Sequence, residues 1–124
     1  MSAVFSKLVL EHIGPNQWRL TEPLHYHSPD GTVTLAIPAG FECDLASIPR
    51  IFWSLLSPAG KYARAAVLHD YLYTIASPRT EETRAAADWE FLVAMKAEGV
   101  RWLARNTMHQ AVRQFGGPVF YRKR

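Results

Sequence analysis

The sequence predicts an α+β fold, in which a small N-terminal antiparallel β-hairpin or sheet packs on a three-helix core. Three observations support this prediction. Extended segments separated by turn residues lie before residue 45, one strong turn precedes an alternating run, and apolar residues recur at helical spacing after residue 60. We expect a single domain over residues 1–124, with 1–45 mainly β, 46–116 helical and 117–124 a basic tail, because no repeat or linker interrupts the chain.

The strand predictions come from alternation and turn chemistry. Residues 5–12 alternate weakly, residues 14–16 look like a turn, and residues 17–27 look extended. Residues 28–31 have the turn sequence SPDG, and the alternating residues 32–37 that follow predict a hairpin.

Two groups in the first half of the chain are candidate metal ligands. Asp44 precedes residues 47–56, which look like a capped short helix. Its carboxylate either accepts backbone N–H bonds and fixes the loop, or joins Asp70 and His69 in a metal site; both roles stay open. His25 and His27 share one face of a strand, but no third ligand lies nearby, so we interpret them as surface residues.

An antiparallel helix pair is predicted over residues 61–99. The first helix has a buried stripe with a histidine in its middle, formed by Tyr62, Ala65, Ala66, His69, Leu72, Tyr73 and Ala76. The second has the same period but carries a carboxylate where an apolar residue is expected, in the set Ala85, Asp88, Phe91, Leu92 and Met95. Pro78 separates the helices, Ser77 or Thr80 can cap the second, and Gly99 can end it.

The helix pair brings candidate catalytic residues to the same level. His69 and Asp88 are equally far from the midpoint of the turn, so in antiparallel helices they should lie side by side. A carboxylate that holds one imidazole N–H orients the ring and makes its other nitrogen more basic. Tyr73, one turn after His69, can donate to Asp88, while Asp70 points toward the edge of the pair and could bind a hard cation. The alternative is a buried polar cluster that only keeps the helices in register.

A third helix is predicted from residue 100 to about residue 115. Its inward residues should be Ala104, Met108, Ala111 and Phe115, and the sequence Gly116-Gly117-Pro118 should end it. The other face has basic residues spaced by four, which form a candidate basic patch of Arg101, Arg105, His109 and Arg113. This patch is either a solvated helix face or a surface that faces phosphate groups.

The chain resembles two known protein families, and the first resemblance is limited to the predicted helix pair. The strings HDYLY and AADWEFLVAM resemble the catalytic helix pair of the phospholipase A2 superfamily, especially the phospholipase domains of parvoviral capsid proteins. This resemblance implies that His69 activates water, Asp70 holds calcium or another divalent cation, Asp88 orients His69 and Tyr73 braces Asp88. The glycine-rich calcium loop of that superfamily has no counterpart here.

The second resemblance covers nearly the whole chain. The ordered motifs FECDLASIPRIFW, LHDYLY, AADWEF and AVRQFGG are similar to a phage and prophage family catalogued as domain of unknown function 1353. The resemblance implies a phage or prophage gene product from the virion, tail or lysis region, with other phage structural proteins as partners, and it carries no established activity.

The composition of the chain indicates the cellular compartment in which we expect the protein. The single Cys43 excludes an internal disulfide and a cysteine-based zinc cluster. Neither a signal peptide nor a run of membrane-spanning length is visible, so we expect synthesis in the host cytoplasm. A phage protein could still leave by cell lysis, and it could be incorporated in the virion. The net charge of +3 is modest, and no acidic residue follows Glu98.

Three functions are consistent with these patterns. The first is a metal-assisted hydrolase, in which His69 takes a proton from water while a cation on Asp70 polarises an ester or lipid carbonyl. The second is a non-catalytic phage component that uses the cluster as a scaffold. The third is an accessory factor that binds nucleic acid through the basic patch, although sequence-specific binding is not expected because no recognition motif is present.

Overall fold

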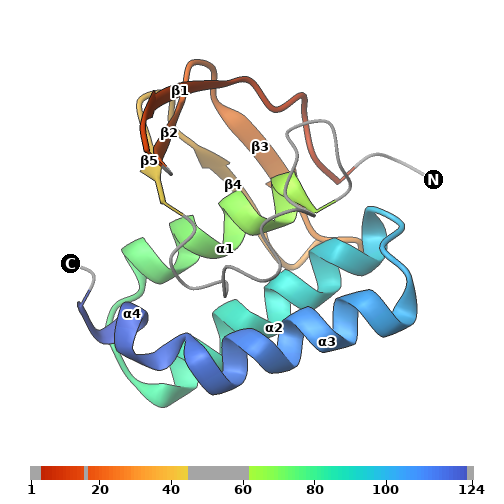
Figure 1. The fold of residues 1–124 in the computed structure, drawn as a ribbon. Helices are drawn as coiled ribbons and strands as arrows, with labels where there is room; N and C mark the ends of the chain where they lie inside the picture. The colour runs from red at the N-terminus through yellow and green to blue at the C-terminus, as the bar shows by residue number, and fades with distance from the viewer. Residues whose placement is uncertain (1–3, 16, 45–61, 123–124) are drawn as a thin grey trace.

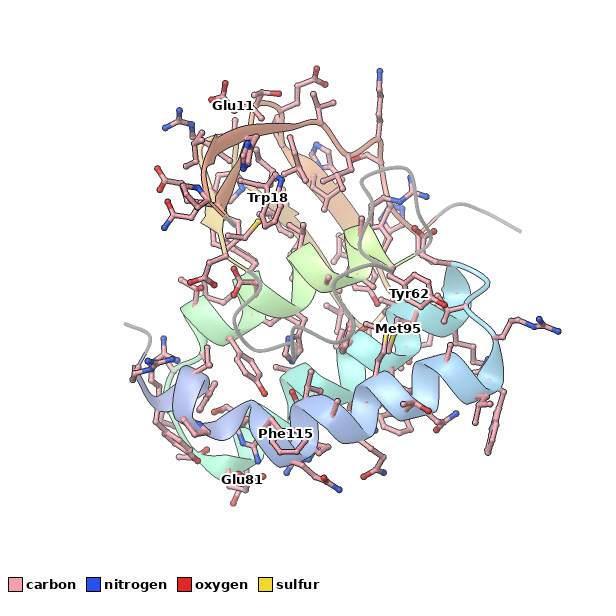
Figure 2. All side chains as sticks on the ribbon, in the orientation of Figure 1. Glu11, Trp18, Tyr62, Glu81, Met95 and Phe115 are labelled. Atoms are coloured by element: carbon pink, nitrogen blue, oxygen red, sulfur yellow. The ribbon has the colours of Figure 1, made fainter. Side chains whose placement is uncertain are left out.

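The computed structural model describes residues 4–15, 17–44 and 62–122, which form small antiparallel sheets and four helices. Helix α1 (Ala63–Ile75) lies in the middle, with the strands on one side and the other helices on the opposite side (Figure 1). Side chains follow the same division: Glu11 and Trp18 lie among the strands, while Glu81 and Phe115 lie on the far side of α1 (Figure 2). The predicted α+β class is confirmed.

The strands form two sheets. The first has the order β1 (Leu10–Gly14), β2 (Gln17–Leu20) and β5 (Glu42–Cys43), and all its pairings are antiparallel. The second is the hairpin of β3 (Leu24–His27) and β4 (Thr34–Ile37), which confirms the hairpin predicted from the SPDG turn. The weakly alternating start of the chain is a strand only from Leu10 onward.

The hydrophobic core surrounds α1. The helix is buried on most of its circumference, more widely than one stripe predicts, through Ala63, Ala65, Ala66, Val67, Leu68, His69, Asp70 and Tyr73. On the strand side, the rings of Tyr71 and Phe41 meet edge to face at 5.2 Å. Helix α2 (Glu81–Ala97) covers the other side with Phe91, Ala94 and Met95, which are fully buried. Burial on both sides holds α1 firmly, so the polar groups on it have fixed positions.

Local signals set the limits of α2. Thr80 caps the helix, because its Oγ1 accepts the Thr83 N–H at 3.2 Å while Thr83 Oγ1 accepts the Thr80 N–H at 3.0 Å. At the other end Gly99 has φ of +86°, and the Val100 N–H donates to the Met95 carbonyl at 2.9 Å. This is a Schellman ending, which favours glycine at the left-handed position.

The C-terminal third differs from the prediction in two places. Helix α3 (Trp102–Phe115) buries Met108, Ala111 and Val112, but Phe115, expected inward, is 63% exposed at the helix end. Residues 117–122, expected to be part of a basic tail, form helix α4 (Gly117–Arg122). Pro118 suits the first turn of a helix, and the fully buried Phe120 packs edge to face on Tyr73 at 4.9 Å. The short helix expected within residues 47–56 lies outside the described residues.

Candidate functional site

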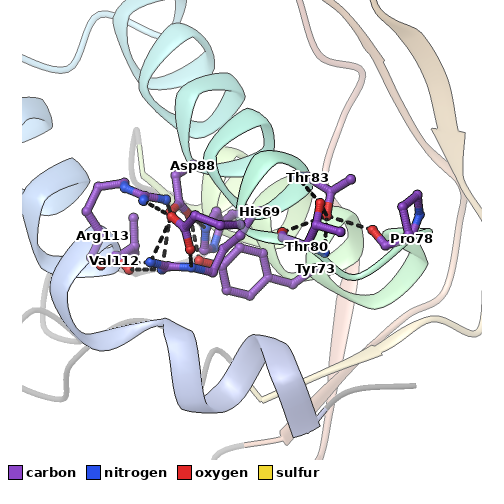
Figure 3. A network of polar contacts seen from close by, with 10 residues as sticks. His69, Tyr73, Pro78, Thr80, Thr83, Asp88, Val112 and Arg113 are labelled. Atoms are coloured by element: carbon purple, nitrogen blue, oxygen red, sulfur yellow. Dashed lines mark hydrogen bonds and ion pairs between the residues drawn. The ribbon is translucent and has the colours of Figure 1, made fainter.

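His69 and Asp88 are in contact where α1 and α2 cross. His69 Nε2 lies 2.7 Å from Asp88 Oδ1, and the Tyr73 hydroxyl donates to the same oxygen at 2.6 Å (Figure 3). The imidazole also packs against two rings, with centroid distances of 4.1 Å to Tyr73 and 4.8 Å to Phe91. These contacts fix both the position and the plane of the His69 ring. The three residues predicted as a catalytic set therefore come together.

Two arginines complete the surroundings of Asp88. Arg113 of α3 donates from Nη1 to Asp88 Oδ2 at 2.6 Å, and Arg84 Nη1 lies 3.6 Å from the same oxygen. Both guanidinium groups also pair with Glu81 at the start of α2. Arg84 further donates to the carbonyls of Val112 and Arg113 at 3.2 Å each, so it joins α2 to the end of α3.

Sequence reasoning missed these two arginines. Arg84 had a usable signal, because it lies four residues before Asp88 and three after Glu81 and therefore faces the same way on α2. The spacing by four residues places Arg113 in the predicted basic patch instead.

The charges of the cluster favour an ionised Asp88. Burial opposes ionisation, but the bonds from His69, Tyr73 and Arg113 hold the pKa of Asp88 below its ordinary value. Burial and the bond to Asp88 raise the pKa of Tyr73, so its hydroxyl stays a donor. A carboxylate only accepts hydrogen bonds, so His69 Nε2 carries the proton and, in the neutral ring, Nδ1 does not. Both side chains, His69 and Asp88, have zero exposure to solvent.

The two candidate metal ligands differ in their exposure to solvent. Asp70, expected at an open edge, is fully buried in α1, whereas Asp44 is exposed just after β5. Within residues 4–15, 17–44 and 62–122, no group of three or more His, Cys, Asp and Glu side chains is placed to hold a metal ion. His25 and His27 are exposed on β3, where a surface role was expected.

The four residues of the predicted basic patch have different surroundings in the structure. Arg101 is exposed before α3, but Arg105 Nη1 donates to the Val100 carbonyl at 3.1 Å. His109 packs edge to face on Trp89 at 6.5 Å, and burial lowers its pKa, which favours the neutral ring. Arg113 donates a hydrogen bond to Asp88. The four residues therefore do not present a common row of cations.

None of the helices in the described residues is long and apolar enough to cross a bilayer.

Comparisons with known proteins give a family and no activity. Residues 18–112, more than half of the chain, match the family described as "Protein of unknown function (DUF1353)". An uncharacterized protein, y4jT, of Sinorhizobium fredii (strain NBRC 101917 / NGR234) is 31% identical over 101 residues, which cover 80% of this chain but only 29% of y4jT. No solved structure matches the chain. The chain therefore belongs to the DUF1353 family.

Proposed function

We propose that this protein is a small hydrolase of ester bonds, with a phospholipase A2-like arrangement in which His69 is the general base. One observation carries the proposal: His69 Nε2 and the Tyr73 hydroxyl both bind Asp88 Oδ1, at 2.7 and 2.6 Å. Because Asp88 holds the Nε2 proton, Nδ1 is the nitrogen that would take a proton from an attacking water. The His69 side chain has zero exposure, so this step requires that water and substrate gain access to Nδ1. Tyr73 would act as a positioning residue for Asp88.

The role of Asp88 in this proposal is mainly orientation. Arg113 and Arg84 lie 2.6 and 3.6 Å from Asp88 Oδ2 and balance most of its negative charge. The carboxylate therefore adds less charge stabilisation to a protonated His69 than an isolated carboxylate would. It still selects the tautomer and the ring direction, which a general base requires.

A divalent cation, calcium or similar, is a separate part of the proposal. Asp70, next to His69, is the residue that would hold it, with Asp44 as a second carboxylate. Calcium takes six to eight oxygen ligands, and within the described residues no group of three or more His, Cys, Asp and Glu side chains is placed to hold a metal ion. We therefore derive no step through a metal, and its involvement is tested independently by comparing activity with and without a chelator.

The test is hydrolysis of phospholipid vesicles and soluble short-chain esters by purified protein. Removing the base with His69→Ala should lower kcat by about 10²–10⁴-fold. Asp88→Asn, which keeps the shape, and Tyr73→Phe, which keeps the ring, should give smaller losses. His25→Asn is the matched control, because His25 is exposed on β3, and it should keep wild-type activity. Thermal melts establish that each variant is folded.

Two results would reject the proposal. One is wild-type protein that hydrolyses none of these substrates with or without calcium. The other is activity that survives His69→Ala in a folded protein.

A scaffold role is the second candidate, favoured by the complete burial of His69 and Asp88. On this alternative, the carboxylate joins α1, α2 and α3 through His69, Arg84 and Arg113, and the protein is a non-catalytic phage component. It predicts no hydrolysis, together with a large stability loss when Asp88 is replaced. The same set of variants separates the two functions, because only the hydrolase proposal predicts that His69→Ala lowers the rate of hydrolysis.

Phage or prophage origin is also a proposal, supported by the phage and prophage motifs that the sequence resembles. A virion component should be detected by mass spectrometry in particles purified after induction of a strain that carries the gene. Its absence from the particles, while the protein is present in the lysate, would exclude the virion role.

A further inference from the structure

A groove on the side of α2 away from α3 contains a carboxylate among apolar residues. Its volume is about 320 Å³, within the range of small-molecule sites. Leu72 and Ile75 of α1, Ala86 and Ala87 of α2, and Val33 before β4 form most of its wall. Glu90 of α2 also lines it. The hydrolase proposal uses none of these residues.

Glu90 is held in place from the strand side. The hydroxyl of Tyr26, a β3 residue with zero exposure, donates to Glu90 Oε2. Burial, then the bond to Glu90, raises the pKa of Tyr26, so this hydroxyl remains a donor. Tyr26 therefore fixes the direction of the carboxylate and leaves Oε1 for another donor.

The described residues give Glu90 no cationic partner. Its neighbours in the groove are mainly apolar, and no Lys, Arg or His in residues 4–15, 17–44 and 62–122 forms an ion pair with it. A partly buried carboxylate gains most from a cation that also brings apolar surface, because the cation balances its charge while the surface displaces water from the groove.

We propose that the groove lined by α1, α2 and Val33 is a binding site for a small primary ammonium ion with a compact apolar body. The ammonium group donates to Glu90 Oε1, and the apolar body lies against Leu72, Ile75 and Ala86. Neutral analogues lack the charge, and anionic ones are repelled by Glu90. The site is independent of the proposed catalysis at His69.

The test is an NMR titration of the full chain with n-butyl- and n-hexylammonium, with 1-butanol and 1-hexanol as neutral matches. The ammonium ions should bind about tenfold more tightly than the alcohols, as expected for one charged hydrogen bond. Shift changes of methyl groups should be confined to the residues that line the groove, which are Val33, Leu72, Ile75, Ala76, Thr83, Ala86 and Ala87.

Two variants isolate the contribution of Glu90. Glu90→Gln keeps an acceptor for Tyr26 but removes the charge, so the preference for ammonium should disappear. Glu82→Gln is the matched control, since it makes the same change at an exposed α2 position outside the groove. Ala86→Leu fills the groove and should weaken binding of ammonium and alcohol alike.

The proposal is overturned by equal binding of amines and alcohols, by a preference that survives Glu90→Gln, or by no saturable binding. Binding of a lysine-containing apolar peptide without binding of the free amines would also overturn it and indicate a protein partner. None of these results depends on hydrolysis.

Discussion

At the scale of single residues, Asp88 decides what the cluster can do. One of its oxygens accepts hydrogen bonds from His69 and Tyr73, and the other accepts a hydrogen bond from Arg113. A buried carboxylate with this many donors is stable only as long as they remain, because an uncompensated buried charge is costly. The same bonds that would orient a catalytic histidine therefore also hold the helices together.

The lowered pKa of Asp88 predicts a dependence of stability on pH. A carboxyl group whose pKa is lower in the folded state stabilises the fold fully above its ordinary value of 3.8 and loses this contribution as the pH falls through the folded pKa. We expect Asp88→Ala to cost about 3–5 kcal/mol at pH 7. The difference in the free energy of unfolding between wild type and Asp88→Ala should decrease below about pH 4.

Urea denaturation of wild type and Asp88→Ala between pH 7 and pH 3 measures this effect. Glu82→Ala, at an exposed position of the same helix, controls for the loss of a carboxylate. A free-energy difference between wild type and Asp88→Ala that stays constant over this range would contradict the prediction.

At the scale of elements, the contact between α1 and α2 was predictable from the sequence. The turn around Pro78 fixes the midpoint, and a constant rise per residue then places His69 opposite Asp88. The arginines were harder to predict, because periodicity assigns charged residues to solvent while long guanidinium side chains can reach a buried acceptor. Helix α4 is not predicted because Gly116-Gly117-Pro118 is typical of a helix end, although Pro118 also suits a helix start.

The junction of α3 and α4 allows a matched pair of substitutions. A Cβ at Gly116 would lie 2.6 Å from the Val112 carbonyl oxygen and 2.8 Å from the Tyr73 hydroxyl. A Cβ at Gly117 meets nothing closer than Arg84 Cζ at 3.9 Å. Gly116→Ala should therefore destabilise the fold by about 1–3 kcal/mol through overpacking, whereas Gly117→Ala should be neutral or slightly stabilising.

Thermal denaturation of the two glycine variants distinguishes these effects. Equal melting temperatures for Gly116→Ala and Gly117→Ala would contradict the close approach of Gly116 to the Val112 carbonyl and the Tyr73 hydroxyl.

At the scale of the whole molecule, one carboxylate connects three helices. α1 reaches Asp88 through His69 and Tyr73, and α3 reaches it through Arg113. The α+β class could be predicted because alternation and helical spacing separate cleanly along the chain. The contact of α3 with Asp88 could not, because Arg113, which makes it, is distant in sequence from Asp88.

This connection predicts unequal effects for two arginine substitutions. Arg113→Met leaves buried Asp88 without its closest cation and should cost about 3–5 kcal/mol, with little dependence on salt. Arg19→Met removes an exposed pair with Glu11, 2.9 Å apart, and should cost about 0–1 kcal/mol. Urea denaturation at low and high salt compares them, and similar costs for both variants would argue against a central role for Asp88.

The proposed base and the scaffold both depend on which nitrogen of His69 carries the proton. Nitrogen NMR of histidine-labelled protein reports this directly at a pH where the ring is neutral, with the His69 signals assigned by their loss in His69→Gln. We predict the proton on Nε2, held by Asp88, and a changed pattern in Asp88→Asn. A proton on Nδ1 would mean that Asp88 does not orient the ring, and both the proposed base and the scaffold built on this bond would then be contradicted.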